Sequence, residues 1–211
     1  MRRGSDPADV AHLAESLRTA GAKTVAVEAD LGQVESAAYV FDAAERALGP
    51  VAALVLCHVE DRETDILGTS VEGFDHQLAV NVRGSWLLVR ELGRRFRGEP
   101  GRGRIVGITS DHLAGSVGYT ASKGALDRIV LAAAKEFAAL GITANVVEPG
   151  PTDTGWMSDE QRADFKRSNP QGRVGTPEDC ANAVRFLCSA DGGWINAQVL
   201  HSNGGLYSRL W

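Results

Sequence analysis

Short apolar segments alternate with amphipathic helices along this chain, and this alternation restricts the fold more than any other feature. The predicted strands are short and mostly aliphatic, and they cover residues 24–27, 52–57, 104–108, 143–147 and 197–201. The predicted helices cover residues 7–20, 34–48, 72–96, 118–140 and 177–188. Strands joined by helices of about 12 residues or more form right-handed crossovers, which produce a parallel sheet. The sequence therefore predicts an α/β fold, a doubly wound parallel sheet in a single domain over residues 1–211.

Composition argues against several classes of function. The 22 basic and 27 acidic side chains give a net charge of −5, which argues against nucleic acid or an acidic membrane as a partner. The longest apolar run, Val51–Cys57, is far shorter than the ~18 residues of a membrane helix. The three cysteines form no CxxC pair and the histidines are not at metal-ligand spacing, so we expect buried thiols and no metal. These features favour a cytoplasmic protein.

Candidate chemistry follows the predicted strand 104–108. Open α/β sheets bind ligands outside the carboxyl ends of their strands. Thr109 and Ser110 come directly after this strand, and Tyr119 and Lys123 open the next predicted helix. Residues i and i+4 share a helix face, so the Tyr119 phenol and the Lys123 ammonium are expected side by side. The alternative is an ordinary solvated pair on a helix surface.

A neighbouring cation has the right magnitude of effect on a phenol. The pKa of a phenol is ~10, and acid–base work near neutrality requires it to fall by roughly 2–3, which corresponds to about 3–4 kcal/mol. A cation ~4 Å away supplies about 4 kcal/mol at an effective dielectric constant of ~20. Lys123 is therefore sufficient to make Tyr119 an acid or base, and the Ser110 hydroxyl can hold a reacting carbonyl oxygen.

These residues stand within longer motifs. The motifs are Gly103-Arg-Ile-Val-Gly-Ile-Thr-Ser110, Tyr119-x-x-x-Lys123, Asn81-Val-Arg-Gly84, Asp30-Leu31, Pro149-Gly-Pro-Thr-Asp-Thr154, Arg173-Val-Gly-Thr-Pro-Glu-Asp179 and Asn203-Gly-Gly205. In combination they resemble the short-chain dehydrogenase/reductase family, in particular its 3-oxoacyl-reductase-like branch. The resemblance extends from Asp6 to Leu206 and implies a Rossmann-like fold.

The resemblance implies an NAD(P)-dependent enzyme that interconverts a carbonyl and an alcohol by hydride transfer. Tyr119 would be the acid/base, Lys123 its helper and a ligand of the nicotinamide ribose, Ser110 the carbonyl-binding group and Asn81 the anchor of a relay water. The implied cofactor-binding residues are Asp30, Leu31, Tyr119, Lys123, Pro149, Gly150, Thr152 and Thr154. The cofactor would be NADP or NAD, with NADP favoured, and the substrate a small carbonyl compound or alcohol.

The chain departs from the family pattern in three places. The nine residues from Ser110 to Tyr119 are a shorter spacing than usual, and Leu56-Cys57-His58-Val59 replaces an Asn-Asn-Ala-Gly stretch. The family's first strand, its Thr-Gly-x-x-x-Gly-x-Gly turn and helix, and its second strand have no counterpart, so the domain is expected to be truncated at its N-terminus. The residues at 24–27 and 52–57 then either pair directly or leave unpaired strand edges.

Several side chains carry open alternatives. His58 and His112 either face the cleft or serve packing and solvation, and Trp156 belongs either to a substrate lid or to the core. Arg2 and Arg3 either contact an NADP phosphate or are solvated. The helices 72–96 and 118–140 resemble those that pair subunits in the family, so we expect a dimer or tetramer. The rival functional hypothesis is a truncated, non-catalytic member that acts through oligomerisation and binds the dinucleotide poorly.

Overall fold

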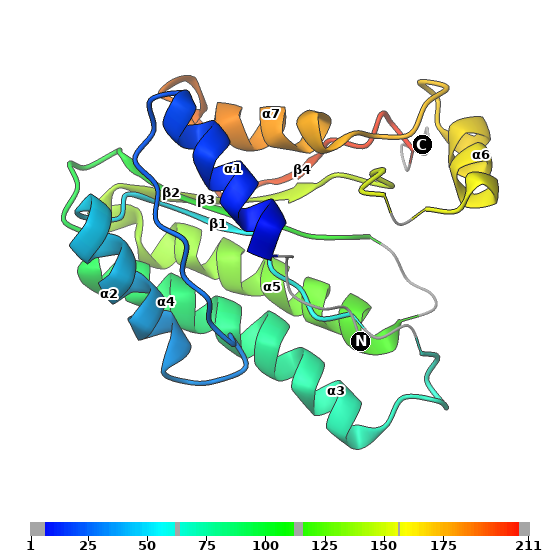
Figure 1. The fold of residues 1–211 in the computed structure, drawn as a ribbon, viewed down its shortest axis with the longest axis horizontal. Helices are drawn as coiled ribbons and strands as arrows, with labels where there is room; N and C mark the ends of the chain where they lie inside the picture. Colours follow the sequence, from blue (N-terminus) through cyan, green and yellow to red (C-terminus); the bar gives the residue numbers. More distant parts are fainter. Residues whose placement is uncertain (1–6, 62–63, 112–115, 156, 207–211) are drawn as a thin grey trace.

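The computed structural model describes residues 7–61, 64–111, 116–155 and 157–206 (Figure 1). Its strands are β1 (Ala53–Leu56), β2 (Gly103–Ile108), β3 (Ile142–Glu148) and β4 (Val199–His201). Its α-helices are α1 (Pro7–Thr19), α2 (Ser36–Leu48), α3 (Val71–Leu78), α4 (Ser85–Arg95), α5 (Val117–Glu136), α6 (Asp159–Ser168) and α7 (Pro177–Cys188). A π-helical segment, η1 (Ala79–Gly84), joins α3 to α4, and two 3₁₀ turns are η2 (Ala138–Leu140) and η3 (Asp191–Trp194).

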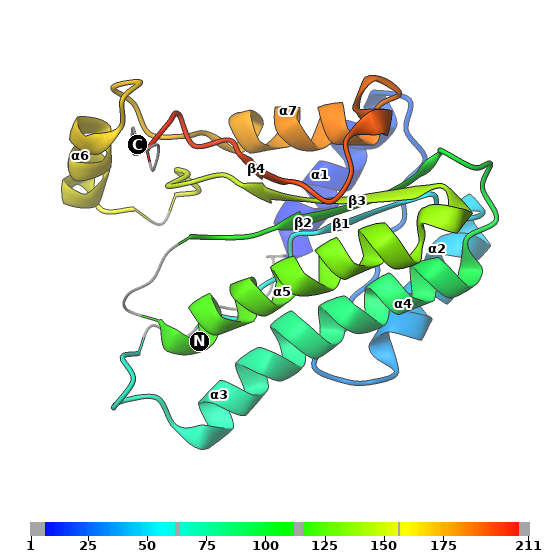
Figure 2. The same ribbon diagram turned by 180° about the vertical axis from the view of Figure 1, so that it is seen from behind.

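The four strands form one parallel sheet in the order β1-β2-β3-β4. Helices α4 and α5 cover one face of this sheet and α7 covers the other (Figures 1 and 2). The chain therefore has the predicted α/β fold with a parallel sheet between helical layers. All carboxyl ends of the strands lie at one edge, as in any parallel sheet with helical crossovers.

Alternate residues of the central strands build a core on each face of the sheet. Ile105 and Val146 are fully buried in the cluster under α4 and α5. Val106 and Val147, one residue further along, pack with Leu187 of α7 on the opposite face. This is the pattern of strands that are covered on both sides, because successive side chains point to opposite faces.

The predicted strand 24–27 is wrong. Residues 22–30 have no regular secondary structure, and within the described ranges β1 pairs with β2 alone. A segment forms a β-strand only when it makes hydrogen bonds with a neighbouring strand. Among the described residues, no strand is available to pair with residues 24–27. The second outcome therefore applies: β1 keeps an unpaired edge, and α1 has no buried residue. Cys57, directly after β1, is exposed and not buried as expected.

The remaining boundaries differ from the prediction in smaller ways. The predicted helix 72–96 is interrupted by η1, and the predicted helix 118–140 ends at Glu136, followed by η2. Gly141 then has a φ of 69°, a left-handed conformation that glycine adopts without strain. Helix α6 was not predicted at all, whereas α7 begins and ends as predicted. Among the described residues, no helix is both long enough and apolar enough to cross a membrane.

Candidate active site at the carboxyl end of the sheet

The tip of β2 lies against the first turns of α5. The Lys123 Nζ donates a hydrogen bond to the Ile108 carbonyl oxygen at 2.7 Å, and the Thr109 hydroxyl donates to the Lys123 carbonyl oxygen at 3.4 Å. Ser110 follows Thr109 directly and is half-buried. The predicted strand tip and the predicted helix start are therefore adjacent in space.

Tyr119 and Lys123 lie on consecutive turns of α5. The Lys123 Nζ is 5.6 Å from the centroid of the Tyr119 ring. Tyr119 is half-buried, whereas Lys123 is 4% exposed. Gly118, the residue before Tyr119, packs so tightly on Gln77 of α3 that a Cβ atom would lie 2.6 Å from Gln77 Oε1. Glycine at this position therefore lets the turn that carries Tyr119 approach α3 closely.

Burial changes the electrostatics of Lys123. Desolvation is the main cause that lowers the pKa of Lys123 from 10.5 to about 8, and negative charge on Cys57, Asp127 or Asp61 opposes it. The group remains mostly protonated at neutral pH. An ammonium has three N–H donors, and the Ile108 carbonyl takes one of them. Lys123 thus supplies a buried positive charge with donors left for a ligand.

Asn81 is buried in the π-helical segment η1 and connects three elements. Its Oδ1 accepts from the Glu60 N–H at 2.7 Å, and its Nδ2 donates to the Glu60 carbonyl at 2.8 Å. Nδ2 also donates to Ser122 Oγ at 2.9 Å, and the Ser122 hydroxyl donates to the Tyr119 carbonyl at 2.7 Å. Asn81 is therefore bonded to the helix turn that carries Tyr119 and Lys123. Single-turn π segments occur frequently at functional sites.

Asp30 and Leu31 form a turn beside η1. The Asp30 carboxylate accepts from the Gly32 N–H at 2.8 Å, and this bond, followed by that from Gln33, lowers the pKa of Asp30. Leu31 is partly buried, and its carbonyl oxygen would lie 2.7 Å from a Cβ atom at Gly84. The turn is thus fixed against η1, with the exposed Asp30 carboxylate at its tip.

The loop after β3 contains the other predicted cofactor residues. Pro149, Gly150 and Thr152 are half-buried, and Thr154 is exposed. Gly150 has a φ of 62°, and a Cβ atom there would lie 2.6 Å from the Asn203 Cβ. The Thr152 hydroxyl donates to the Gly150 carbonyl at 3.2 Å. The loop is therefore tightly turned at the carboxyl edge, next to the C-terminal turn of the chain.

Sequence reasoning missed a polar cluster at the same edge. His201 Nδ1 lies 3.4 Å from both Asp111 Oδ2 and Glu148 Oε2. Glu148 is 2% exposed, and Asn203 Nδ2 donates to its Oε2 at 2.7 Å. The position of these residues at the ends of β2, β3 and β4 was the available signal, because the carboxyl ends of neighbouring parallel strands meet.

Other side chains singled out from the sequence have mixed outcomes. His112, Trp156, Arg2 and Arg3 lie outside the described residues, so their alternatives stay open. Trp194 is 98% exposed and does not pack within the described chain.

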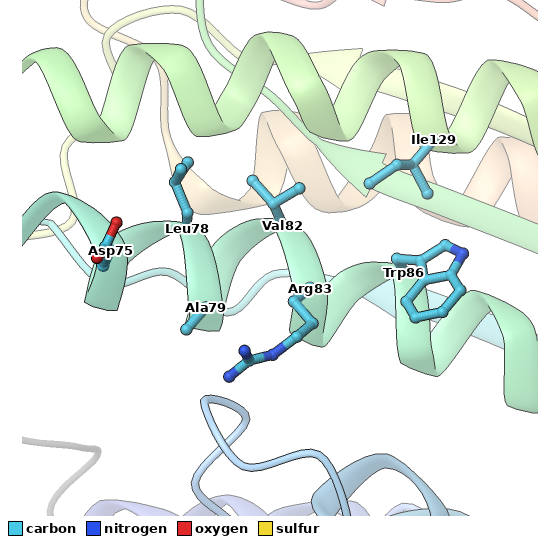
Figure 3. A pocket seen from close by; sticks show the side chains of 7 residues that line it. All are labelled: Asp75, Leu78, Ala79, Val82, Arg83, Trp86 and Ile129. Carbon is cyan, nitrogen blue, oxygen red and sulfur yellow. The ribbon is translucent and has the colours of Figure 1, made fainter.

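A hollow surface lies on the α4–α5 side of the molecule. A pocket of about 540 Å³ opens between the α3–η1–α4 helix and α5, and Figure 3 shows Leu78, Val82 and Ile129 pointing into it from both sides. A neighbouring pocket of about 570 Å³ shares Trp86 and Ile129 with the first. We call the surface formed by these two pockets the α4–α5 face. Trp86 is 47% exposed, and the Arg90 guanidinium lies 5.5 Å from its ring centroid.

Comparison with known proteins agrees with this architecture. A family model described as enoyl-(acyl carrier protein) reductase matches residues 4–207. The uncharacterized oxidoreductase YjdA of Bacillus subtilis (strain 168) is 34% identical over 206 residues, which are 95% of this chain and 82% of that protein. The chain belongs to the short-chain dehydrogenase/reductase family. It is thus an oxidoreductase of this family and shares the family's Rossmann fold.

Two further relatives of this short-chain dehydrogenase/reductase are informative. An NADPH-dependent aldehyde reductase-like chloroplastic protein of Arabidopsis thaliana is 35% identical over 202 residues, 90% of this chain and 74% of that protein. A short-chain dehydrogenase from Burkholderia cenocepacia J2315, solved in complex with NADP, superposes with a TM-score of 0.89 at 26% identity. That match covers 98% of this chain and 86% of the other.

The residues present fit one half of a dinucleotide better than the other. Lys123 offers buried donors for ribose hydroxyls, and the tight Gly150 turn lies at the same edge. A pyrophosphate is normally held by a glycine-rich turn at the start of a helix that follows a strand. In the described part of the chain, β1 is followed by the segment Cys57–Asp61 and not by such a turn. The described residues therefore fit the nicotinamide-ribose half of a dinucleotide, but they do not include a turn that would hold its pyrophosphate.

Substitution of Lys123 tests its buried charge. Because its pKa is about 8 in the folded chain and 10.5 ordinarily, the unfolded chain binds more protons between these pH values. The free energy of unfolding should therefore rise by about 3 kcal/mol between about pH 8 and 10.5, and Lys123→Met should lack this rise and be more stable than the wild type near pH 7. Urea unfolding across this pH range measures both effects. The exposed Lys135→Met is the control on the same helix, and parallel pH curves for wild type and Lys123→Met would contradict the burial.

Proposed function

We propose that this chain is an NAD(P)-dependent reductase that interconverts a carbonyl and an alcohol, with Tyr119 as its acid/base. The observation that carries the proposal is the buried Lys123 ammonium, which lies 5.6 Å from the centroid of the Tyr119 ring and donates to the last residue of β2, two residues before Ser110. A fixed cation beside a phenol favours the ionised form of that phenol. Hydroxyl, phenol and ammonium at one strand tip suit proton transfer to a carbonyl oxygen.

The roles of the side chains follow from their chemistry. Ser110 holds the carbonyl oxygen of the substrate by a hydrogen bond, and Tyr119 donates a proton to that oxygen. Lys123 stabilises the resulting phenolate and binds the nicotinamide ribose with its remaining donors. Asn81 holds the π-helical segment against the Tyr119 turn and anchors the water that returns a proton toward Lys123. When bound, the nicotinamide supplies or accepts the hydride.

NADP is the favoured cofactor, and Asp30, Leu31, Pro149, Gly150, Thr152 and Thr154 are the residues proposed to contact it. The support is that the Burkholderia cenocepacia relative binds NADP and the Arabidopsis thaliana relative is described as NADPH-dependent. The proposed substrates are small aldehydes and ketones, including 3-oxoacyl thioesters. The thioesters are included because the 3-oxoacyl-[acyl-carrier-protein] reductase FabG of Aquifex aeolicus (strain VF5) is 32% identical over 194 residues. The cytoplasm is the proposed compartment, on the evidence of the three free cysteines.

The unpaired edge of β1 favours a second candidate function. That edge and the absence of a described phosphate cradle suit a chain that binds the dinucleotide poorly and acts by oligomerising with copies of itself or with a relative. This chain would be a non-catalytic family member. The two functions differ in whether the chain binds and oxidises NADPH.

We further propose that the α4–α5 face pairs two copies of the chain. The face combines exposed Trp86 and half-buried Ile129 with arginines at 90, 94 and 128 and an acidic group at Glu136. A two-fold interface brings the same patch of each copy together, so a patch with both charges and a central aromatic is self-complementary.

Removal of the phenolic hydroxyl tests the catalytic assignment. Tyr119→Phe should lower kcat by roughly 10²- to 10⁴-fold, because the substrate oxygen loses its proton donor. Loss of NADPH absorbance with a panel of aldehydes and 3-oxoacyl thioesters measures it. Tyr39→Phe, at a 56% exposed position of α2, is the matched control. An undiminished rate in Tyr119→Phe would refute the role of Tyr119.

NADPH binding separates the enzyme from the non-catalytic candidate. The reductase should give a saturable change in NADPH fluorescence with a dissociation constant in the micromolar range, typical of enzyme ligands. The donors of Lys123 contribute, so Lys123→Met should weaken this binding. A titration without saturation would support the non-catalytic candidate.

A charge at the centre of the α4–α5 face should break the proposed oligomer. Trp86→Arg places a third guanidinium beside Arg90 and Arg94 and should shift the chain from dimer or tetramer to monomer, because like charges are then buried together. Sedimentation velocity measures the mass. Leu67→Arg, at a 96% exposed position away from this face, is the control. An unchanged mass for Trp86→Arg would exclude this face.

A further inference from the structure

His58 stands at the carboxyl end of β1, where sequence analysis left open whether it faces the cleft or packs inside. The structure places it, half-buried, against the start of the η1–α4 helix. Its Nε2 lies 3.3 Å from the Val80 carbonyl oxygen and 3.2 Å from Ser85 Oγ. The imidazole therefore bridges the end of a strand and the π-helical segment that carries Asn81.

The direction of these hydrogen bonds follows from Ser85. Its hydroxyl carries one proton, and it donates that proton to the Asn81 carbonyl oxygen at 2.6 Å. Ser85 Oγ can then only accept from His58, and the Val80 carbonyl is also an acceptor. Both contacts thus require a proton on Nε2 of His58. Burial is the main cause that lowers the pKa of His58; the hydrogen bond to Val80 opposes this shift, and the Lys123 charge adds to it. The lowered pKa keeps the ring neutral, with its one proton on Nε2.

A continuous set of buried bonds connects His58 to the active-site helix. Ser85 holds the main chain of Asn81, and the Asn81 side chain donates to Ser122 Oγ at 2.9 Å. Ser122 in turn donates to the Tyr119 carbonyl oxygen at 2.7 Å. Ser85 and Asn81 are 1% and 4% exposed, and Ser122 is fully buried, so water does not replace these bonds.

The π-helical geometry of η1 explains what the hydrogen bonds of His58 and Ser85 stabilise. A π turn moves carbonyls out of the regular ladder of an α-helix, and a serine that bonds the carbonyl four residues earlier bends the helix further. His58 and Ser85 bond two successive carbonyls of this segment, those of Val80 and Asn81. These side chains thereby stabilise the turn on which Asn81 stands.

We propose that His58 is a positioning residue that, with Ser85, fixes η1 and so holds Asn81 in register with the Tyr119–Lys123 helix. The kinetic part of this inference rests on the proposed reductase function. It makes His58 a donor to the π-helical segment and not a ligand of the substrate. His58 lies in the stretch Leu56-Cys57-His58-Val59, where this chain departs from the Asn-Asn-Ala-Gly pattern of the family.

A kinetic cycle tests the proposal. His58→Leu and Ser85→Ala should each lower kcat about tenfold, the equivalent of one well-formed hydrogen bond, while KM changes by less than about twofold. Because both act on the same segment, the double variant should also lose about tenfold and not the roughly hundredfold of independent effects. His58→Gln, whose amide can donate in place of Nε2, should recover most of the rate.

His12→Leu, at an exposed position of α1, is the control. The positioning role would be overturned if the loss of kcat in each variant simply followed its loss of thermal stability and if the two losses added up in the double variant.

A second readout does not depend on turnover. In nitrogen-15 spectra of the full chain, His58 should show the neutral Nε2–H tautomer, and the Asn81 side-chain amide protons should exchange slowly with solvent. His58→Leu should accelerate that exchange about tenfold or more, because Asn81 loses its fixed backbone. Unchanged exchange would overturn the inference. If wild type reduces no carbonyl while the exchange result holds, the proposed function fails and the positioning of Asn81 stands.

Discussion

The bond from the Lys123 ammonium to the Ile108 carbonyl is the interaction on which the site depends. It joins the first turns of α5 to the tip of β2, and it does so with a charge that is almost completely removed from solvent. A buried ammonium is costly, and the cost appears as a pKa of about 8. Such an arrangement persists only where the surrounding packing holds it. Here the core under α4 and α5 holds it, with Val130 and Leu126 of α5 buried against the sheet.

The second structural feature that matters for function is the unpaired edge of β1. Among the described residues β1 pairs on one side only, and α1 leaves Leu13 and Leu17 exposed. The four strands and their two helical layers nevertheless bury a core on both faces. Ser110, Tyr119 and Lys123 therefore lie at the carboxyl edge of a sheet that has a core on both faces.

Sequence patterns predicted most of the fold because local signals and tertiary packing agree in most segments. Helix α7 begins at Pro177 after a Thr176–Asp179 capping box, which is a signal confined to four residues. The segment 24–27 failed because its β-branched residues give a strand propensity but cannot supply a partner strand. The π turn at Asn81 also escaped prediction, since it arises from His58 and Ser85, which are distant from one another in sequence. The same holds for the Asp111–Glu148–His201 cluster, whose members come from the segment after β2 and from the last residues of β3 and β4.

The transfer of a labelled hydrogen tests most directly whether the residues at the tip of β2 and the start of α5 reduce a carbonyl. The full chain is incubated with NADPH that carries deuterium at the transferable C4 position, together with the aldehyde and 3-oxoacyl substrates. Mass spectrometry of the alcohol product should show one deuterium on the carbinol carbon. An alcohol product without the label, or no alcohol from any substrate at saturating NADPH, would contradict the account.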